Sequence, residues 1–182
     1  MRAGWLAAVV ASWALAEGPA SARPVAEWTL GPKTQVLGLF AFGHQSMPAL
    51  SLGFDARLEL SRLSLDATAG LILPASPALE PGRELSPRAL FAHASASVLV
   101  NPDDVATCYL GAGIEPRLLL PSLTVALVPS AEVGVLLWRH GSTRLGLELR
   151  VGQNLLPVFV LTQLRRDGVY PTEVALGVAV GW

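Results

Sequence analysis

Alternation of apolar and polar residues dominates the chain from residue 50 onward. Residues 50–60, LSLGFDARLEL, place leucine, phenylalanine and alanine on one parity, and serine, glycine and charged residues on the other. A period of two puts successive side chains on opposite faces of a β-strand. The other alternating segments are 63–73, 89–100, 107–117, 130–138, 143–152 and 172–182. With an extended segment at 35–42 that is apolar on both parities, the pattern predicts eight strands.

The predicted connections alternate in length. The short ones are 61–62, 101–106 and 140–142. The mostly longer ones are 43–49, 74–88, 118–123 and 154–171. Short turns on one side and longer loops on the other are typical of membrane barrels. The chain is therefore predicted to be all-β, an antiparallel up-and-down transmembrane β-barrel.

Two segments are too apolar to be plain loops. They are LLLPSLTVALV at 118–128 and NLLPVFVLTQL at 154–164. Each segment either lengthens the flanking strands or contains another strand, which would give ten. Eight strands are favoured.

The polar parity of the strands carries small residues and charges, and the chain has one lysine, Lys33. A soluble barrel would be expected to present lysine and long polar side chains on that face. An arginine facing lipid at the bilayer midplane would cost about 2–4 kcal/mol, whereas charges inside a narrow lumen can pair. Trp138 and Tyr109, near the short turns, also lie on this parity. We therefore expect an internal polar network of Asp55, Arg57, Glu59, Asp66, His93, Glu115, Arg117, Glu132, Arg144, Glu148, Arg150 and Glu173.

Composition supports a membrane protein without a helical span. Hydrophobic residues make up 52% of the chain and charged residues 15%, against roughly 25% in soluble domains. After the N-terminus, no run approaches the roughly 18 apolar residues of a spanning helix. A net charge of −1 without a basic stripe excludes nucleic acid as a partner. The single cysteine, Cys108, cannot form an internal disulfide, and the three histidines lack metal-ligand spacing, so neither metal nor cofactor is expected.

The N-terminus has the layout of a secretory signal peptide. Arg2 precedes an apolar stretch at 5–16, and small-residue cleavage patterns end at Ala16 and Ala22. We expect residues 1–22 to be a signal peptide, cleaved after 16 or 22, and residues 23–182 to form a single barrel domain.

The leader, the eight alternating strands and the ending VALGVAVGW together resemble small bacterial outer-membrane β-barrels of the OmpA/OmpX-like architecture. The resemblance implies export to the bacterial outer membrane and outer-membrane lipid as a neighbour. In that group the barrel-assembly machinery recognises a last strand that ends in an aromatic residue after alternating hydrophobic residues. Trp182, Val180 and Val178 match that assembly signal.

Three function classes follow from these patterns. The leading one is a non-enzymatic barrel with a structural or surface-binding role through its outer loops; a general porin is excluded because side chains fill an eight-stranded lumen. The second is a lipid-modifying hydrolase or acyltransferase, since His44 and Ser46 resemble the His-x-Ser pair of outer-membrane lipid A deacylases. The third is a secreted soluble barrel that binds a lipophile.

Overall fold

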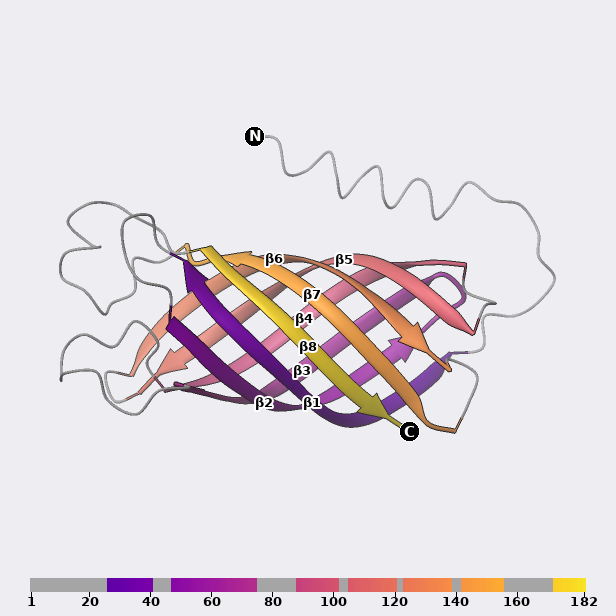
Figure 1. Ribbon diagram of the computed structural model, residues 1–182, viewed down its shortest axis with the longest axis horizontal. Coiled ribbons are helices and arrows are strands. Elements are labelled where there is room, and N and C mark those ends of the chain that lie inside the picture. Colours follow the sequence, from indigo (N-terminus) through magenta and orange to yellow (C-terminus); the bar gives the residue numbers. More distant parts are fainter. Residues whose placement is uncertain are drawn as a thin grey trace, which may run out of the picture.

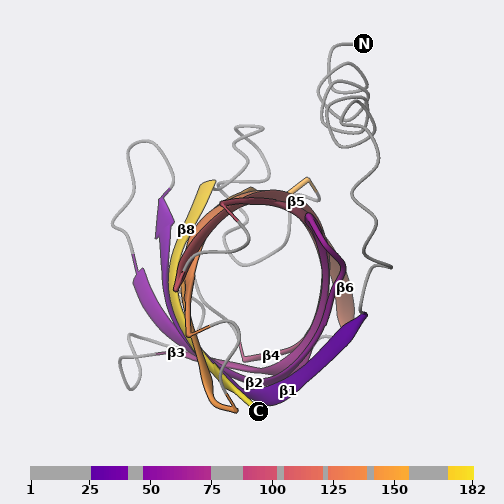
Figure 2. The same ribbon diagram turned by 90° about the vertical axis from the view of Figure 1, so that its right-hand side faces the viewer.

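The protein is a closed eight-stranded antiparallel barrel in a computed structural model (Figure 1). The structure describes residues 26–40, 47–74, 88–101, 105–120, 123–138, 142–155 and 172–182. The strands are β1 (Glu27–Phe40), β2 (Met47–Glu59), β3 (Leu63–Pro74), β4 (Ala89–Val100), β5 (Ala106–Leu119), β6 (Thr124–Leu137), β7 (Arg144–Gln153) and β8 (Thr172–Gly181). Each strand pairs with the next, and β8 pairs with β1, so the ring seen end-on in Figure 2 is complete. The predicted eight-stranded up-and-down fold is confirmed.

The strand boundaries differ most from the sequence-based prediction in two regions of the chain. The first strand begins at Glu27 rather than Gln35, because the backbone stays extended through Gly31-Pro32-Lys33. In the apolar segment 118–128, β5 continues to Leu119 and β6 starts at Thr124, so this segment lengthens two strands and adds none. The second apolar segment lies mostly outside the described residues. No helix among the described residues is long and apolar enough to cross a membrane.

The two ends of the barrel differ in their connections. At one end of the barrel, connections join β1 to β2, β3 to β4, β5 to β6 and β7 to β8. We call this the long-connection end, and the opposite end the short-turn end. Most outward positions are apolar: Leu147 is 43% exposed and Leu176 63% exposed. The neighbouring inward residues, Glu148 and Ala175, are buried. The barrel is therefore apolar outside and polar inside, the reverse of a soluble barrel.

Three exposed tryptophans lie at the short-turn end. Trp28 near the start of β1 and Trp182 after β8 are exposed, and Leu30 exchanges backbone hydrogen bonds of 3.2 and 3.1 Å with Trp182. Trp138 is also exposed, although its parity along the sequence points into the lumen. Its positive φ of 55° ends the extended backbone just after β6, so the alternation of the strand no longer places this side chain in the lumen. Tyr109, on the same parity in β5, does stay inside.

Three prolines each interrupt the hydrogen-bonded ladder between two neighbouring strands. Pro32 in β1 breaks the pairing with β8, Pro116 in β5 the pairing with β4, and Pro129 in β6 the pairing with β7. Proline has no N–H to donate, and a closed barrel has no free edge where the loss would be harmless. On its other side each of these prolines is still paired, so the strands themselves run on.

A glycine on β6 makes room for the Tyr109 ring. Gly134 lies directly opposite Tyr109 on β5, and a Cβ on Gly134 would overlap the Tyr109 ring and the carbonyl oxygen of Leu147. At Gly146, which is also inside the barrel, the nearest atoms to an added Cβ are 3.6 Å away. Of these two positions, only position 134 requires glycine, because its neighbours leave no room for a Cβ.

We predict that Gly134→Ala lowers the free energy of unfolding by about 1–3 kcal/mol, the usual cost of overpacking a tight interior. The matched variant Gly146→Ala should leave stability unchanged or raise it slightly, because an alanine fits there and restricts the unfolded chain. Denaturant titration of the refolded barrel in detergent micelles measures both. Equal losses in the two variants would contradict the proposed role of Gly134.

Candidate functional site: the charged barrel interior

The charged side chains expected on the polar parity lie inside the barrel. Arg144 is half-buried and the others are buried: Asp55, Arg57, Glu59, Asp66, His93, Glu115, Arg117, Glu132, Glu148, Arg150 and Glu173. The pair His44 and Ser46 lies outside the described residues. Of the expected assembly signal, Val178 and Trp182 are exposed on the outer face and Val180 is half-buried.

The interior also contains Lys33, which the sequence analysis did not place. Lys33 is only 3% exposed and points inward from β1. With Lys33, the described part of the interior carries five basic and seven acidic side chains. The signal that could have found it is the alternation of Trp28, Leu30 and Val36 against Thr29 and Lys33, which Gly31-Pro32 obscures.

Two arginines and two glutamates form a closed ring of ion pairs, which we call the Arg117–Arg150 ring. Arg117 donates to Glu115 at 2.5 Å and to Glu173 at 2.6 Å. Arg150 donates to the same two carboxylates, at 2.5 and 3.3 Å. The ring joins β5, β7 and β8. Each arginine bridges the two carboxylates with separate N–H groups, and all four hydrogen bonds are charge-assisted.

Glu148 on β7 is the centre of a second cluster. It accepts hydrogen bonds from Lys33 at 2.8 Å, Gln35 at 3.0 Å and the Tyr109 hydroxyl at 3.2 Å. Lys33 also lies 3.9 Å from Asp55, so one ammonium group serves two carboxylates. Three donors on one buried carboxylate compensate for its loss of hydration.

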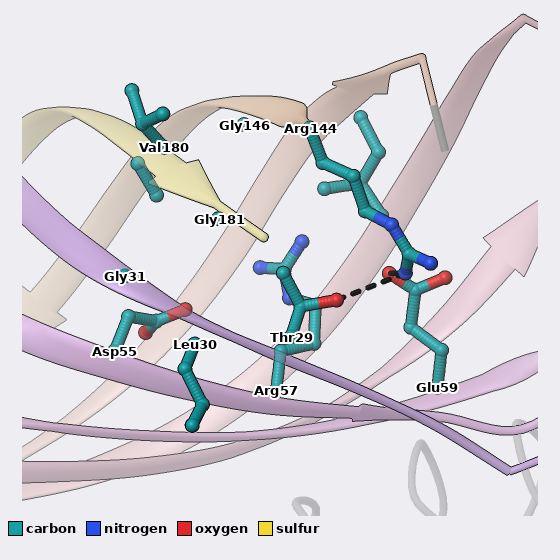
Figure 3. A pocket seen from close by; sticks show the side chains of 12 residues that line it. Thr29, Leu30, Gly31, Asp55, Arg57, Glu59, Arg144, Gly146, Val180 and Gly181 are labelled. Atoms are coloured by element: carbon teal, nitrogen blue, oxygen red, sulfur yellow. Dashed lines mark hydrogen bonds and ion pairs between the residues drawn. The ribbon is translucent and has the colours of Figure 1, made fainter. Parts of the chain in front are cut away.

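Two further arginines lie toward the short-turn end. Arg57 donates from Nε to Asp66, and its guanidinium lies 5.2 Å from the centre of the Tyr109 ring, within cation–π range. Arg144 donates to Thr29 at 2.9 Å and to Glu59 at 3.2 Å, as the dashed lines in Figure 3 show. These contacts connect β7 with β1 and β2 across the lumen.

Glu132 is the described interior carboxylate without an arginine or lysine partner. It accepts a hydrogen bond from Ser97 at 2.9 Å, and its nearest cationic candidate is His93, with Nε2 at 3.9 Å. Its second oxygen, Oε2, has no hydrogen-bond partner among the described atoms. The Glu132 carboxylate therefore has weaker polar interactions than the other carboxylates in the lumen.

Clusters of buried apolar residues lie inside the barrel near both of its ends. Phe91 and Leu37 belong to a buried cluster at the long-connection end. Leu99 and Leu136 pack with Tyr109 in a smaller cluster at the short-turn end. These buried apolar side chains lie next to the charged groups and exclude water, which strengthens the pairing of the charges.

The histidine that lies near a serine and a carboxylate inside the barrel does not have the geometry of a serine-hydrolase triad. His93 Nε2 lies 3.5 Å from the Ser130 hydroxyl and 3.9 Å from Glu132, so serine and acid face the same ring nitrogen. A serine hydrolase needs its acid on the opposite ring nitrogen, Nδ1. Across the part of the chain that the structure describes, no group of histidine, cysteine and acidic residues could hold a metal ion.

A closed eight-stranded barrel with an apolar exterior and a paired, charged interior defines the fold of the small outer-membrane barrels, the OmpA/OmpX-like architecture. The solved structure of Neisserial surface protein A (NspA) has this fold too, with a TM-score of 0.60 and 15% sequence identity to our chain. The match covers 85% of this chain and 97% of NspA. No protein-family model and no curated protein sequence matches the chain.

We predict that Glu148→Gln destabilises the barrel much more than Glu132→Gln. Removing the Glu148 charge leaves Lys33 buried with only the more distant Asp55, and breaking a buried pair in this way costs about 3–5 kcal/mol. Glu132 has no strong cation to abandon, so its amide variant should change stability by less than about 1 kcal/mol. Denaturant titrations in the same detergent compare the two directly, and a larger loss for Glu132→Gln would refute this ranking.

Proposed function

We propose that the protein is an integral β-barrel of the bacterial outer membrane, exported through a cleaved leader, with a structural or surface-binding role through its longer connections. The observation that supports this most is the inverted polarity of the barrel. Leucine, valine and alanine side chains cover the outside, whereas the charged residues of the strands lie within. Such a surface is stable in lipid and would aggregate in water.

The tryptophans support an orientation in the membrane. Trp28, Trp138 and Trp182 lie at one end, and tryptophan is favoured where hydrocarbon meets the lipid headgroups. In outer-membrane barrels the short turns face the periplasm and the longer loops face outward. The long-connection end would then meet the medium, where a surface-binding partner or a lipid headgroup would be recognised.

The packed interior supports a role other than passage of solutes. The Arg117–Arg150 ring crosses the lumen, and the apolar cluster around Phe91 lies above it at the long-connection end. Eight strands enclose only enough space for side chains. The proposal therefore concerns an anchored outer surface and not a general pore.

The proposal is tested first by cell fractionation with a heat-modifiability gel. We expect the protein in the outer-membrane fraction, and we expect the folded form to migrate differently from the boiled form, because a closed barrel resists unfolding by detergent at room temperature. Recovery from the soluble periplasmic fraction without detergent would sink the proposal.

A cysteine pair on one strand tests which face meets lipid. In a Cys108→Ser background, needed because the native cysteine is exposed, Leu147→Cys should react with a lipid-soluble maleimide. The neighbouring inward variant Gly146→Cys should stay unlabelled until the barrel is boiled, because Gly146 is buried and its site has room for a Cβ. The reverse pattern of labelling would contradict the proposal, because it would mean that the apolar face lies inside the folded protein.

A further inference from the structure

The seam between the first and last strands lacks one hydrogen bond. Leu30 and Trp182 form a hydrogen-bonded pair, and in an antiparallel ladder such pairs recur at every second residue. The next pair is Pro32 opposite Val180, as the register of Lys33 with Ala179 requires. Pro32 has no N–H, so the carbonyl of Val180 loses the donor that this position would otherwise supply.

The Val180 carbonyl turns toward the inside of the barrel at this gap. A Cβ on Gly31, which would point into the lumen, would collide with the carbonyl oxygen of Val180. Glycine at position 31 therefore allows the carbonyl to lean inward. The exterior of the barrel is apolar, so a carbonyl in its wall that lacks a ladder partner needs a donor from inside the protein.

A small cavity lies beneath this carbonyl. Its volume is about 20 Å³, which is enough for one water molecule and little more. Val180 and Gly31 form its wall, and Figure 3 shows polar side chains around it. These lining side chains are Thr29, Asp55, Arg57, Glu59 and Arg144.

The lining favours a neutral ligand that both donates and accepts hydrogen bonds. Two carboxylates and two guanidinium groups surround the cavity, so it attracts neither a cation nor an anion. The bond from Arg57 to Asp66 uses one of the five N–H donors of that guanidinium. A buried water is stable where two to four polar groups can reach it.

We propose that the cavity binds one ordered water, which donates to the Val180 carbonyl in place of the missing proline N–H and is held by the interior charges. The first and last strands are then joined at this point through the charged network. This inference does not depend on the outer-membrane location, since it concerns the folded barrel in any detergent.

The test uses Pro32→Ala, which supplies the missing N–H, with Pro129→Ala as the matched control. Pro129 also interrupts a ladder, between β6 and β7, but it does not line this cavity. Water-to-amide cross-relaxation is recorded by NMR at the Gly31 and Gly181 amides in micelles. We expect the signal of a long-lived bound water in the wild-type protein and in Pro129→Ala, and its loss in Pro32→Ala. The amide that this substitution creates at position 32 should exchange with solvent about tenfold or more slowly than an unpaired amide.

Three outcomes would overturn the inference: no bound-water signal in the wild-type protein, persistence of the signal in Pro32→Ala, or its loss in both variants. If Pro32→Ala does not fold, as judged by the heat-modifiability gel, the high-resolution crystal structure of the wild-type protein decides. Density for a water within hydrogen-bond distance of the Val180 carbonyl supports the proposal, and an empty cavity refutes it.

Discussion

Closing eight strands into one ring leaves an interior with room only for side chains, and the rest of the structure depends on this constraint. Every second residue must enter that narrow space, while its neighbours face outward. Because the outer face is apolar, the charges of each strand are confined to the inside. They are tolerated there only if partners lie within a few ångströms, which is what the Arg117–Arg150 ring and the Glu148 cluster provide.

Small residues on β8 make this pairing possible. Gly177 faces the Gln35 side chain of β1, and a Cβ there would lie 3.0 Å from Gln35 Cγ. Ala175 and Gly181 are likewise small and inward-facing. The last strand thus provides little bulk, which leaves space for the longer side chains of the first strand to reach β7 across it.

The sequence was sufficient for the fold and for the facing of most charges. Period-two alternation puts Glu148 and Leu147 on opposite faces, and the small residues and charges of the polar parity identify the face of Glu148 as the inward one. It failed at Lys33, which precedes the predicted first strand, because Gly31-Pro32 interrupts the alternation although the strand continues through it. It failed again at Trp138, which is exposed because the strand ends before it, at a residue with a positive φ. The sequence could not predict which charges pair with one another. Lys33 and Glu148 are 115 residues apart, and the stagger between strands determines which side chains lie at the same height in the barrel.

The ion pairs join strands that are not neighbours, and this has a mechanical consequence. Tyr109 on β5 and Lys33 on β1 both bind Glu148 on β7, and Arg144 on β7 reaches Glu59 on β2. Backbone ladders fix the circumference of a ring but leave its outline free to flatten into an ellipse. Contacts across the lumen resist this flattening and keep the cross-section of the barrel round. In a bilayer, such a barrel would meet lateral pressure as a stiff cylinder, and the strand ends at its rim would keep a constant spacing.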